Sequence, residues 1–105
     1  MNDTHFTSTS QQPVGLCWYR RKHYARIRAL MIDSDRFPHS YDAWLTAAEA
    51  AEAGYHRERR IVYRIVIDPD IFLTWCAAHN LYPGAQARTL YASLAAERLH
   101  DPDKL

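Results

Sequence analysis

One run of strand-forming residues, Arg60–Asp68, limits what this chain can fold into more than any other part of its sequence. The run reads R-I-V-Y-R-I-V-I-D, is dense in β-branched residues and contains no Gly or Pro. Its alternation places Ile61, Tyr63, Ile65 and Ile67 on one face and Arg60, Val62, Arg64 and Val66 on the other. Because a single strand leaves its N–H and C=O groups unpaired, this strand must find a partner.

The segments on either side of this strand follow helical spacing. Before it, apolar residues predict a helix over residues 18–32 and a second over 41–53, which Ser40 caps and Gly54 ends. After it, Asp68 caps a helix that starts at Pro69 and stops at Asn80. Pro83 starts the last helix, whose inner face is predicted to consist of Ala87, Leu90, Tyr91 and Leu94.

These patterns predict a mainly helical α+β domain with the order helix-helix-strand-helix-helix. Two ways of pairing the central strand stay open. If Tyr24–Ile32 is a second strand, the order becomes β-α-β-α-α and the chain pairs with itself. If Tyr24–Ile32 is helical, the natural partner is the same strand of a second chain, and antiparallel pairing about a two-fold axis gives a homodimer.

At 105 residues the chain has the length of one domain. Residues 1–15 are rich in Asn, Thr, Ser and Gln and predict a disordered N-terminal arm, residues 16–100 predict a single globular domain, and residues 101–105 predict a frayed tail. No apolar run approaches the ~20 residues of a membrane span. The two cysteines, Cys17 and Cys76, lie far apart, which suits a reducing compartment. We therefore expect a cytoplasmic protein without membrane contact.

The segment R-I-V-Y-R-I-V-I-D-P-D is a strand with alternating Arg that runs into a helix start. Together with the two helices that follow, up to Leu99, it resembles the ribbon-helix-helix proteins. In that family two strands from a dimer form a ribbon that enters the DNA major groove. The resemblance implies that Arg60, Val62 and Arg64 read the bases. It also implies that the start of the last helix, around residues 83–85, lies against backbone phosphates.

The net charge is only +1, from 13 Lys and Arg against 12 Asp and Glu, yet the charges are grouped. Five basic residues and no acidic one lie between Arg20 and Arg28, and a second basic group surrounds the start of the strand. Local fields of this kind attract the phosphate backbone of nucleic acid. The predicted nucleic-acid contacts are Arg60, Val62, Arg64, Arg59, Arg20, Arg21 and Lys22. A solvated strand edge explains the same charges without nucleic acid.

Residue types suited to catalysis or metal binding are present but not grouped. The six histidines form no HxxxH pair, and Cys76 with His79 supplies only two of the four ligands that a structural zinc needs. Of the three Asp-x-Asp pairs, Asp68 and Asp70 fit a helix start. The three glycines form no phosphate-binding loop. The sequence therefore predicts no enzyme, no metal site and no cofactor.

Taken together, these features predict a small non-enzymatic binding protein. Its most concrete form is a DNA-binding or regulatory module of the ribbon-helix-helix type that contacts double-stranded DNA as a homodimer. The alternative is a protein–protein interaction or accessory factor without nucleic-acid contact. That alternative would use the segment 18–24 or the exposed helix faces.

Overall fold

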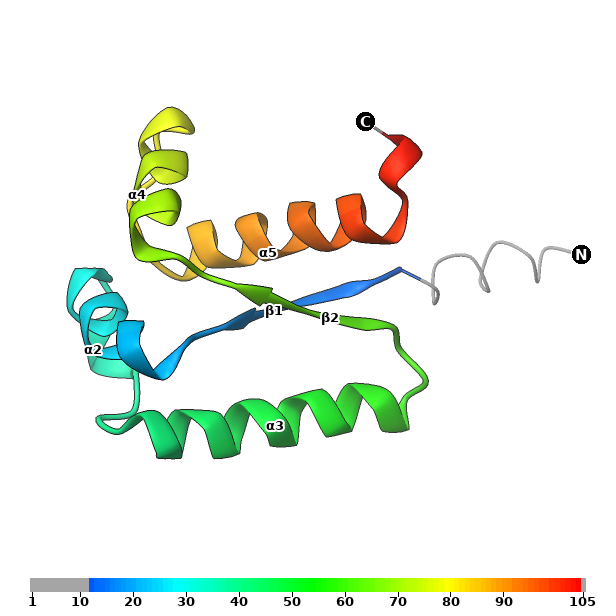
Figure 1. Cartoon of the computed structure of the whole chain (residues 1–105), viewed down its shortest axis with the longest axis horizontal. Helices are drawn as coiled ribbons and strands as arrows, with labels where there is room; N and C mark the ends of the chain where they lie inside the picture. The colour runs from blue at the N-terminus through cyan, green and yellow to red at the C-terminus, as the bar shows by residue number, and fades with distance from the viewer. Residues whose placement is uncertain (1–11, 105) are drawn as a thin grey trace, which may run out of the picture.

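In the computed structural model, which describes residues 12–104, a two-stranded parallel sheet lies between two long helices (Figure 1). The elements follow in the order β1 (Val14–Trp18), α2 (Arg21–Leu30), η1 (Ser34–Arg36), α3 (Tyr41–Arg57), β2 (Val62–Val66), α4 (Pro69–Ala78), α5 (Ala85–His100) and η2 (Pro102–Lys104), where η is a 3-10 helix. Helices α3 and α5 lie on opposite sides of the strands, while α2 and α4 lie at the end where both strands finish. The chain therefore has an α+β fold, as predicted.

The partner of β2 is β1, from the same chain. The two strands run parallel, with Val14 opposite Val62 and Trp18 opposite Val66. Parallel strands need a long crossover connection, and α2, η1 and α3 provide it. The prediction of one central strand without a partner in its own chain is therefore wrong. The alternative is correct that the chain pairs with itself across a helical connection. It places the second strand wrongly, because the segment Tyr24–Ile32 belongs mostly to helix α2.

The sequence pattern of β1 is easily overlooked. Its apolar alternation spans only Val14, Leu16 and Trp18, and Gly15 weakens the strand propensity of so short a run. The predicted arm, residues 1–15, therefore ends too late, since Val14 and Gly15 belong to the strand. Residues 1–11 of that arm lie outside the described residues. The first helix begins at Arg21, not at Trp18.

The predicted N-caps of two helices are confirmed. Ser40 Oγ accepts a hydrogen bond from the Ala43 N–H at 3.0 Å. Asp68 Oδ1 accepts from the N–H groups of Asp70 and Ile71 at 3.0 and 3.1 Å. These bonds satisfy amides that a helix start leaves without an intrahelical acceptor, so local sequence alone sets where α3 and α4 begin.

The predicted helix ends are only partly correct. Asn80 has the left-handed φ of 55° expected of the residue that follows α4. Gly54, in contrast, does not end α3, which continues to Arg57. The left-handed residue after α3 is Arg59, with a φ of 61°. The predicted tail, residues 101–105, includes the 3-10 turn η2.

The largest buried cluster lies at the end of the molecule where the strands finish. Trp18, the last residue of β1, and Tyr19, the residue after it, are 7% and 4% exposed. They pack against rings from α2, α3 and the loop before α3. The aromatic members of this cluster, here called the aromatic end, are Trp18, Tyr19, Tyr24, Phe37, Trp44 and Phe72. Trp44 has ring centroids 5.2 Å from Trp18 and 4.8 Å from Tyr19, a spacing typical of favourable aromatic pairs.

Helix α5 contacts the sheet through small residues, not through the predicted leucines. Ala87, Ala92 and Ala96 are at most 2% exposed, whereas Leu90 and Leu94 are each 40% exposed. A Cβ atom added to Gly15 would lie 2.2 Å from the Ala92 carbonyl oxygen, so the helix backbone approaches β1 too closely for larger side chains. The predicted inner face of α5 is therefore wrong for both leucines. No helix within residues 12–104 is long and apolar enough to span a membrane.

Candidate binding site

The outer edge of β1 has backbone groups without a backbone partner in the part of the chain that the structure describes. The Val14 N–H donates to the Ile61 carbonyl at 2.8 Å, and the Ile67 N–H donates to the Trp18 carbonyl at 2.9 Å. In a parallel ladder alternate residues bond the neighbouring strand, so Val14, Leu16 and Trp18 face β2. The N–H and C=O groups of Gly15 and Cys17 therefore point away from β2. Among the described residues no backbone group of another element bonds them.

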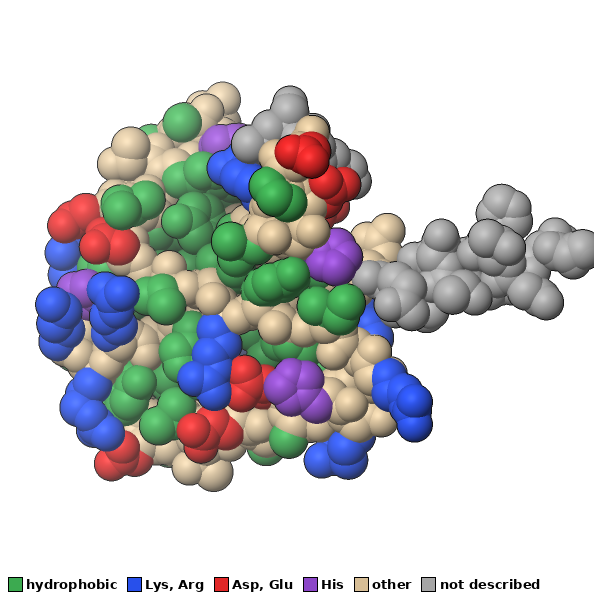
Figure 2. Space-filling view, turned by 45° about the vertical axis from the view of Figure 1, so that its right-hand side comes forward, with side chains coloured by type: hydrophobic (Ala, Val, Ile, Leu, Met, Phe, Trp, Pro, Cys, Tyr) green, Lys and Arg blue, Asp and Glu red, His purple; other side chains and the backbone are tan. Residues whose placement is uncertain are grey.

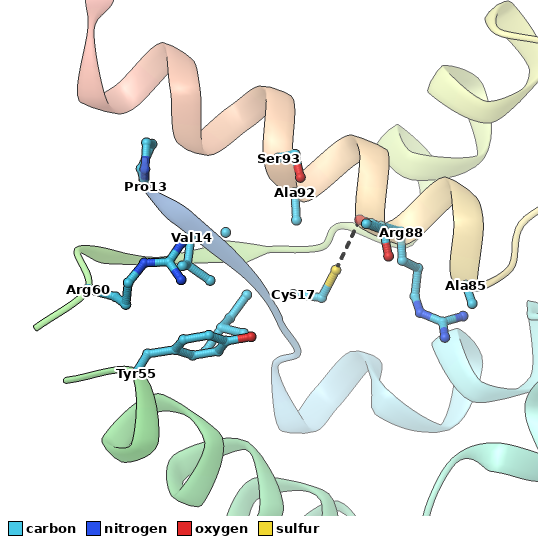
Figure 3. Close-up of a pocket in the computed structure, with 12 residues that line it drawn as sticks. Pro13, Val14, Cys17, Tyr55, Arg60, Ala85, Arg88, Ala92 and Ser93 are labelled. Carbon is cyan, nitrogen blue, oxygen red and sulfur yellow. Dashed lines mark hydrogen bonds between the residues drawn. The ribbon is translucent and has the colours of Figure 1, made fainter. Parts of the chain in front are cut away.

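A groove of about 510 Å³ runs along this edge, between the end of α3 and the first half of α5 (Figure 3). We call it the β1 groove. Its lining residues are Pro13, Val14, Gly15, Leu16, Cys17, Tyr55, Arg60, Ala85, Arg88, Thr89, Ala92 and Ser93. In Figure 3, Tyr55 and Arg60 lie on one side of β1 and the α5 residues Ala92 and Ser93 on the other. Its volume lies within the range of about 300–1,000 Å³ that is usual for ligand sites.

Two arginines lie in the lining of the β1 groove. Arg88 forms a bidentate ion pair with Asp33, with both N···O distances 2.8 Å, and its guanidinium lies 4.8 Å from the Phe37 ring centroid. Arg60 Nη2 donates to the Gln12 carbonyl at 3.3 Å, and its guanidinium lies 5.9 Å from the Tyr55 ring centroid. Arg88 therefore has a carboxylate partner, whereas the partners of Arg60 are neutral.

The thiols of the chain are poor nucleophiles. Burial raises the pKa of Cys17 to about 11, and its Sγ–H donates to the Arg88 carbonyl at 3.5 Å. Burial also raises the pKa of Cys76, which is 2% exposed in the aromatic end. Both side chains therefore stay protonated at neutral pH. The reactive form of cysteine is the thiolate, so neither thiol is a good nucleophile.

Three carboxylates of the Asp-x-Asp pairs have structural partners. Asp68 caps α4, Asp70 pairs with Arg26, and Asp33 pairs with Arg88. His79 Nδ1 lies 2.9 Å from the Trp75 carbonyl of its own helix. Among residues 12–104 no three His, Cys, Asp or Glu side chains are grouped as a metal ion would require.

The predicted nucleic-acid contacts on β2 are not free to act as a ribbon face. Arg64 Nε and Nη2 each lie 2.7 Å from a carboxylate oxygen of Glu52 on α3, and the guanidinium lies 3.9 Å from the Trp18 ring centroid. These hydrogen bonds hold the pKa of Glu52 below its usual value. Val62 lies on the same, α3-facing side of the strand and is half-buried. Entry of this face into a major groove would require α3 to move away.

The other predicted contacts divide between two ends of the sheet. Arg59 and Arg60 precede β2, whereas Arg20, Arg21 and Lys22 follow β1 at the start of α2. Because the strands are parallel, these groups are separated by the length of a five-residue strand, roughly 17 Å. Figure 2 shows groups of Lys and Arg side chains at opposite sides of this face, with apolar, acidic and His side chains and a further basic one between them. The seven predicted residues therefore do not form one surface.

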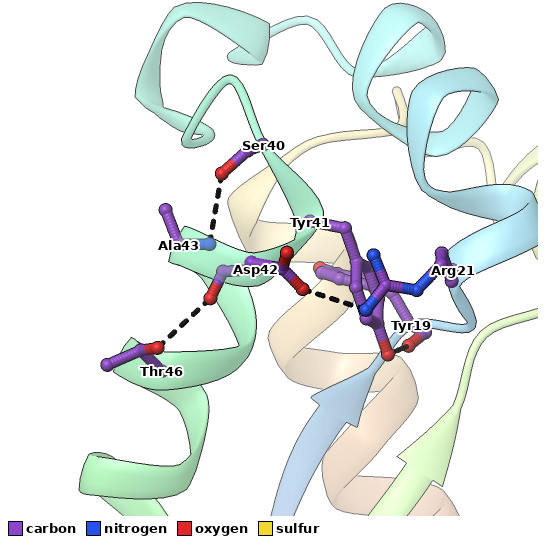
Figure 4. Close-up of polar contacts among 7 residues, drawn as sticks. All are labelled: Tyr19, Arg21, Ser40, Tyr41, Asp42, Ala43 and Thr46. Atoms are coloured by element: carbon purple, nitrogen blue, oxygen red, sulfur yellow. Dashed lines mark hydrogen bonds and ion pairs between the residues drawn. The ribbon is translucent and has the colours of Figure 1, made fainter.

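The basic start of α2 is itself partly paired. Arg21 Nη2 lies 2.7 Å from Asp42 Oδ1, and its guanidinium lies 4.6 Å from the Tyr41 ring centroid (Figure 4). Tyr41 in turn donates its hydroxyl proton to the Tyr19 carbonyl at 2.9 Å. Arg20 and Lys22 are exposed, and no carboxylate of the described residues lies within ion-pair distance of either.

Sequence reasoning missed most of the β1 groove. Of the seven predicted nucleic-acid contacts only Arg60 lines it, and of the predicted phosphate-contacting helix start only Ala85 does. The alternation of Val14, Leu16 and Trp18 is the one local signal of β1 that the sequence carries. No comparable signal points to Thr89 and Ser93, because they reach the groove only through the packing of α5 on Gly15.

No protein-family model matches the chain, and neither a curated protein nor a solved structure is found to be similar to it. The ribbon-helix-helix resemblance of the strand and two helices therefore stays a prediction from the sequence. The candidate site rests on the geometry of the chain itself.

Proposed function

We propose that this chain is a small protein-interaction module that binds an extended segment of a partner protein at an open edge of its sheet. The observation that carries the proposal is the outer edge of β1. There the backbone groups of Gly15 and Cys17 line a groove and have no backbone partner within residues 12–104. Addition of a strand to such an edge is a recurrent way to recognise peptides, because the main chain supplies affinity and adjacent pockets supply specificity.

A binding role also agrees with how the reactive side chains are used. Burial holds the thiols of Cys17 and Cys76 protonated. Asp33 and Asp70 form ion pairs with arginines, and Asp68 caps α4. These contacts support an interaction function and offer no support for nucleophilic or acid–base chemistry.

Selection from a displayed library of random linear hexapeptides tests the proposal without assuming a peptide sequence. We expect the selected peptides to slow amide hydrogen exchange at Gly15 and Cys17, or at Val62, Arg64 and Val66 on the outer edge of β2. Protection confined to helix faces, or no selectable peptide at all, would contradict strand-edge binding.

Nucleic-acid binding is a second candidate function, favoured by one observation. Arg20 and Lys22 are exposed at the start of α2, whose first turn contains no acidic residue. Positive side chains at the positive end of a helix dipole form a local field that attracts phosphate. We propose this surface in place of the β2 ribbon, because Arg64 is already bound by Glu52.

Titration with double-stranded DNA at low and high salt separates the two nucleic-acid surfaces. If the start of α2 binds phosphate, Arg20→Ala/Lys22→Ala should weaken binding and reduce its salt dependence. If the ribbon prediction holds instead, Arg60→Ala/Arg64→Ala should have the larger effect. Binding that is absent at low salt rules out this second function. Sedimentation of the free protein tests the predicted homodimer, in which two copies of β2 would pair through their outer edges.

A further inference from the structure

The β1 groove has a distinct charge character. Its lining contains two arginines, three hydroxyl groups and no acidic side chain. The charge of Arg88 is compensated by its bidentate pair with Asp33. Arg60 is different, because no carboxylate of residues 12–104 lies within ion-pair distance of its guanidinium.

The hydrogen-bonding capacity of Arg60 is also incompletely used. Its Nε atom is shielded from solvent and has no acceptor among the described residues, although buried donors are normally paired. Within residues 12–104 the Arg60 guanidinium makes one hydrogen bond, in which Nη2 donates to the neutral Gln12 carbonyl at 3.3 Å. A guanidinium with an unused donor is well suited to bind a carboxylate, whose oxygens accept charge-assisted hydrogen bonds from it.

From these contacts we infer that the β1 groove binds an extended acidic peptide, whose backbone pairs with Gly15 and Cys17 and whose carboxylate lies against Arg60. The inference rests on the proposed strand-edge function. It specifies the β1 edge as the binding edge and an acidic segment as the ligand. β1 has five residues, so a paired segment of five or six residues spans the edge. Thr89 and Ser93 line the opposite side of the groove, where their hydroxyl groups can donate to a second carboxylate.

The chain's own strands do not match this groove. β1 reads V-G-L-C-W and β2 reads V-Y-R-I-V, so neither contains an acidic residue and β2 carries an additional arginine. If a second copy paired with the β1 edge through either strand, the paired strand itself would supply no carboxylate for Arg60. Charge complementarity therefore favours a foreign acidic segment as the occupant.

Fluorescence anisotropy with labelled hexapeptides tests this inference directly. The probe is Thr-Glu-Val-Glu-Thr-Val, compared with the matched peptide in which Gln replaces both Glu residues. We expect the acidic peptide to bind the full-length chain at least about tenfold more tightly and to slow amide exchange at Gly15 and Cys17. The Arg60→Gln variant should lose about tenfold in affinity for the acidic peptide, and Arg60→Lys should retain most of it.

Matched charge changes provide the controls. Arg57→Gln removes one exposed positive charge near Arg60 but outside the groove, so it should leave affinity unchanged. Thr89→Glu adds a negative charge inside the groove at an exposed position and should weaken binding, even if Arg60→Gln fails to fold. Gln86→Glu adds the same negative charge to α5 outside the groove lining and should leave the affinity for the acidic peptide unchanged.

Each other outcome overturns the inference. Equal affinity for the acidic peptide and its Gln counterpart would contradict the preference for an acidic ligand. The proposed strand-edge binding would still hold if amide exchange slows at Gly15 and Cys17. Protection confined to β2 places the binding edge elsewhere. Concentration-dependent sedimentation with protection of Gly15 and Cys17 identifies a second copy as the occupant. Failure of every library peptide to protect either edge contradicts the proposed function as well.

Discussion

The two ends of the sheet are stabilised in opposite ways. Where the strands finish, large rings from several elements pack together, with Trp44 against Trp18 and Tyr19. Near the start of the strands, α5 approaches Gly15 with Ala92 and Ala96, and Ile65, further along β2, completes this small cluster. We call this second region the alanine end. The aromatic end buries much apolar surface, whereas the alanine end depends on a close backbone approach and leaves the β1 edge open.

This difference separates stability from binding within one small domain. Burial of aromatic side chains contributes strongly to folding free energy, so the aromatic end can hold the four helices and the sheet together. Small side chains contribute less but leave room for a groove beside the strand. The substitutions below test this contrast, from the largest expected effect on the free energy of unfolding to the smallest.

Removal of one ring from the aromatic end should have the largest effect. Trp44 is 9% exposed and contacts four other aromatic rings. We expect Trp44→Ala to lower the free energy of unfolding by about 3–5 kcal/mol, since large-to-small changes lose burial and leave a cavity. Urea unfolding followed by circular dichroism measures this loss. A loss below about 1 kcal/mol would show that the aromatic end is not the main source of stability.

A methyl group on Gly15 should strain the alanine end. The added Cβ would lie 2.2 Å from the Ala92 carbonyl oxygen, which belongs to the helix backbone and cannot rotate away. We expect Gly15→Ala to destabilise the fold by about 2–3 kcal/mol, because α5 must move off the sheet.

The matched control for this change is Gly54→Ala. Gly54 lies inside α3, and a Cβ atom there would approach only the flexible end of Arg57, at 3.6 Å. We expect this variant to be about 0.5–1 kcal/mol more stable, as alanine is favoured over glycine within helices. Equal effects of the two substitutions in urea unfolding would contradict the close approach of α5 to β1.

The ion pair between Asp33 and Arg88 should give a smaller, pH-dependent effect. Hydrogen bonds from Arg88 hold the pKa of the Asp33 carboxyl below its ordinary value of 3.8. Because the folded-state pKa is lower than the unfolded one, the pair stabilises the fold above about pH 4. This contribution is lost as the pH falls through the folded-state pKa.

We expect Asp33→Asn to cost about 1–2 kcal/mol at pH 7, since Arg88 then lies half-buried without a carboxylate. Its stability should also fall less than that of the wild type between pH 5 and pH 3. The control is Glu52→Gln, whose partner Arg64 is 48% exposed and whose loss should cost less than about 1 kcal/mol. Identical acid profiles for the wild type and Asp33→Asn would exclude this contribution.

The leucines of α5 should have the smallest effect. Leu94 is 40% exposed, although its helical spacing predicts an inner position. We expect Leu94→Ala to change the free energy of unfolding by less than about 1 kcal/mol. A loss comparable to that of Trp44→Ala would restore the predicted inner face and remove the contrast between the two ends.

The sequence was informative where one element carries its own signal. The alternation over Arg60–Asp68 predicted β2, and Ser40 and Asp68 predicted the starts of α3 and α4 through hydrogen bonds to amides two or three residues away. Those interactions are local, so short segments specify them. The predicted need for a strand partner was also correct, because unpaired backbone groups are costly in any fold.

Only the tertiary structure decided which segment pairs with β2 and which face of α5 turns inward. Both outcomes depend on contacts between residues far apart in sequence, such as Val14 with Val62 and Gly15 with Ala92. A single glycine favours no strand by itself, yet here it allows a helix to lie directly against the sheet. The β1 groove follows from that contact, which is why helical and strand periodicity determined the elements of this chain but not its candidate binding site.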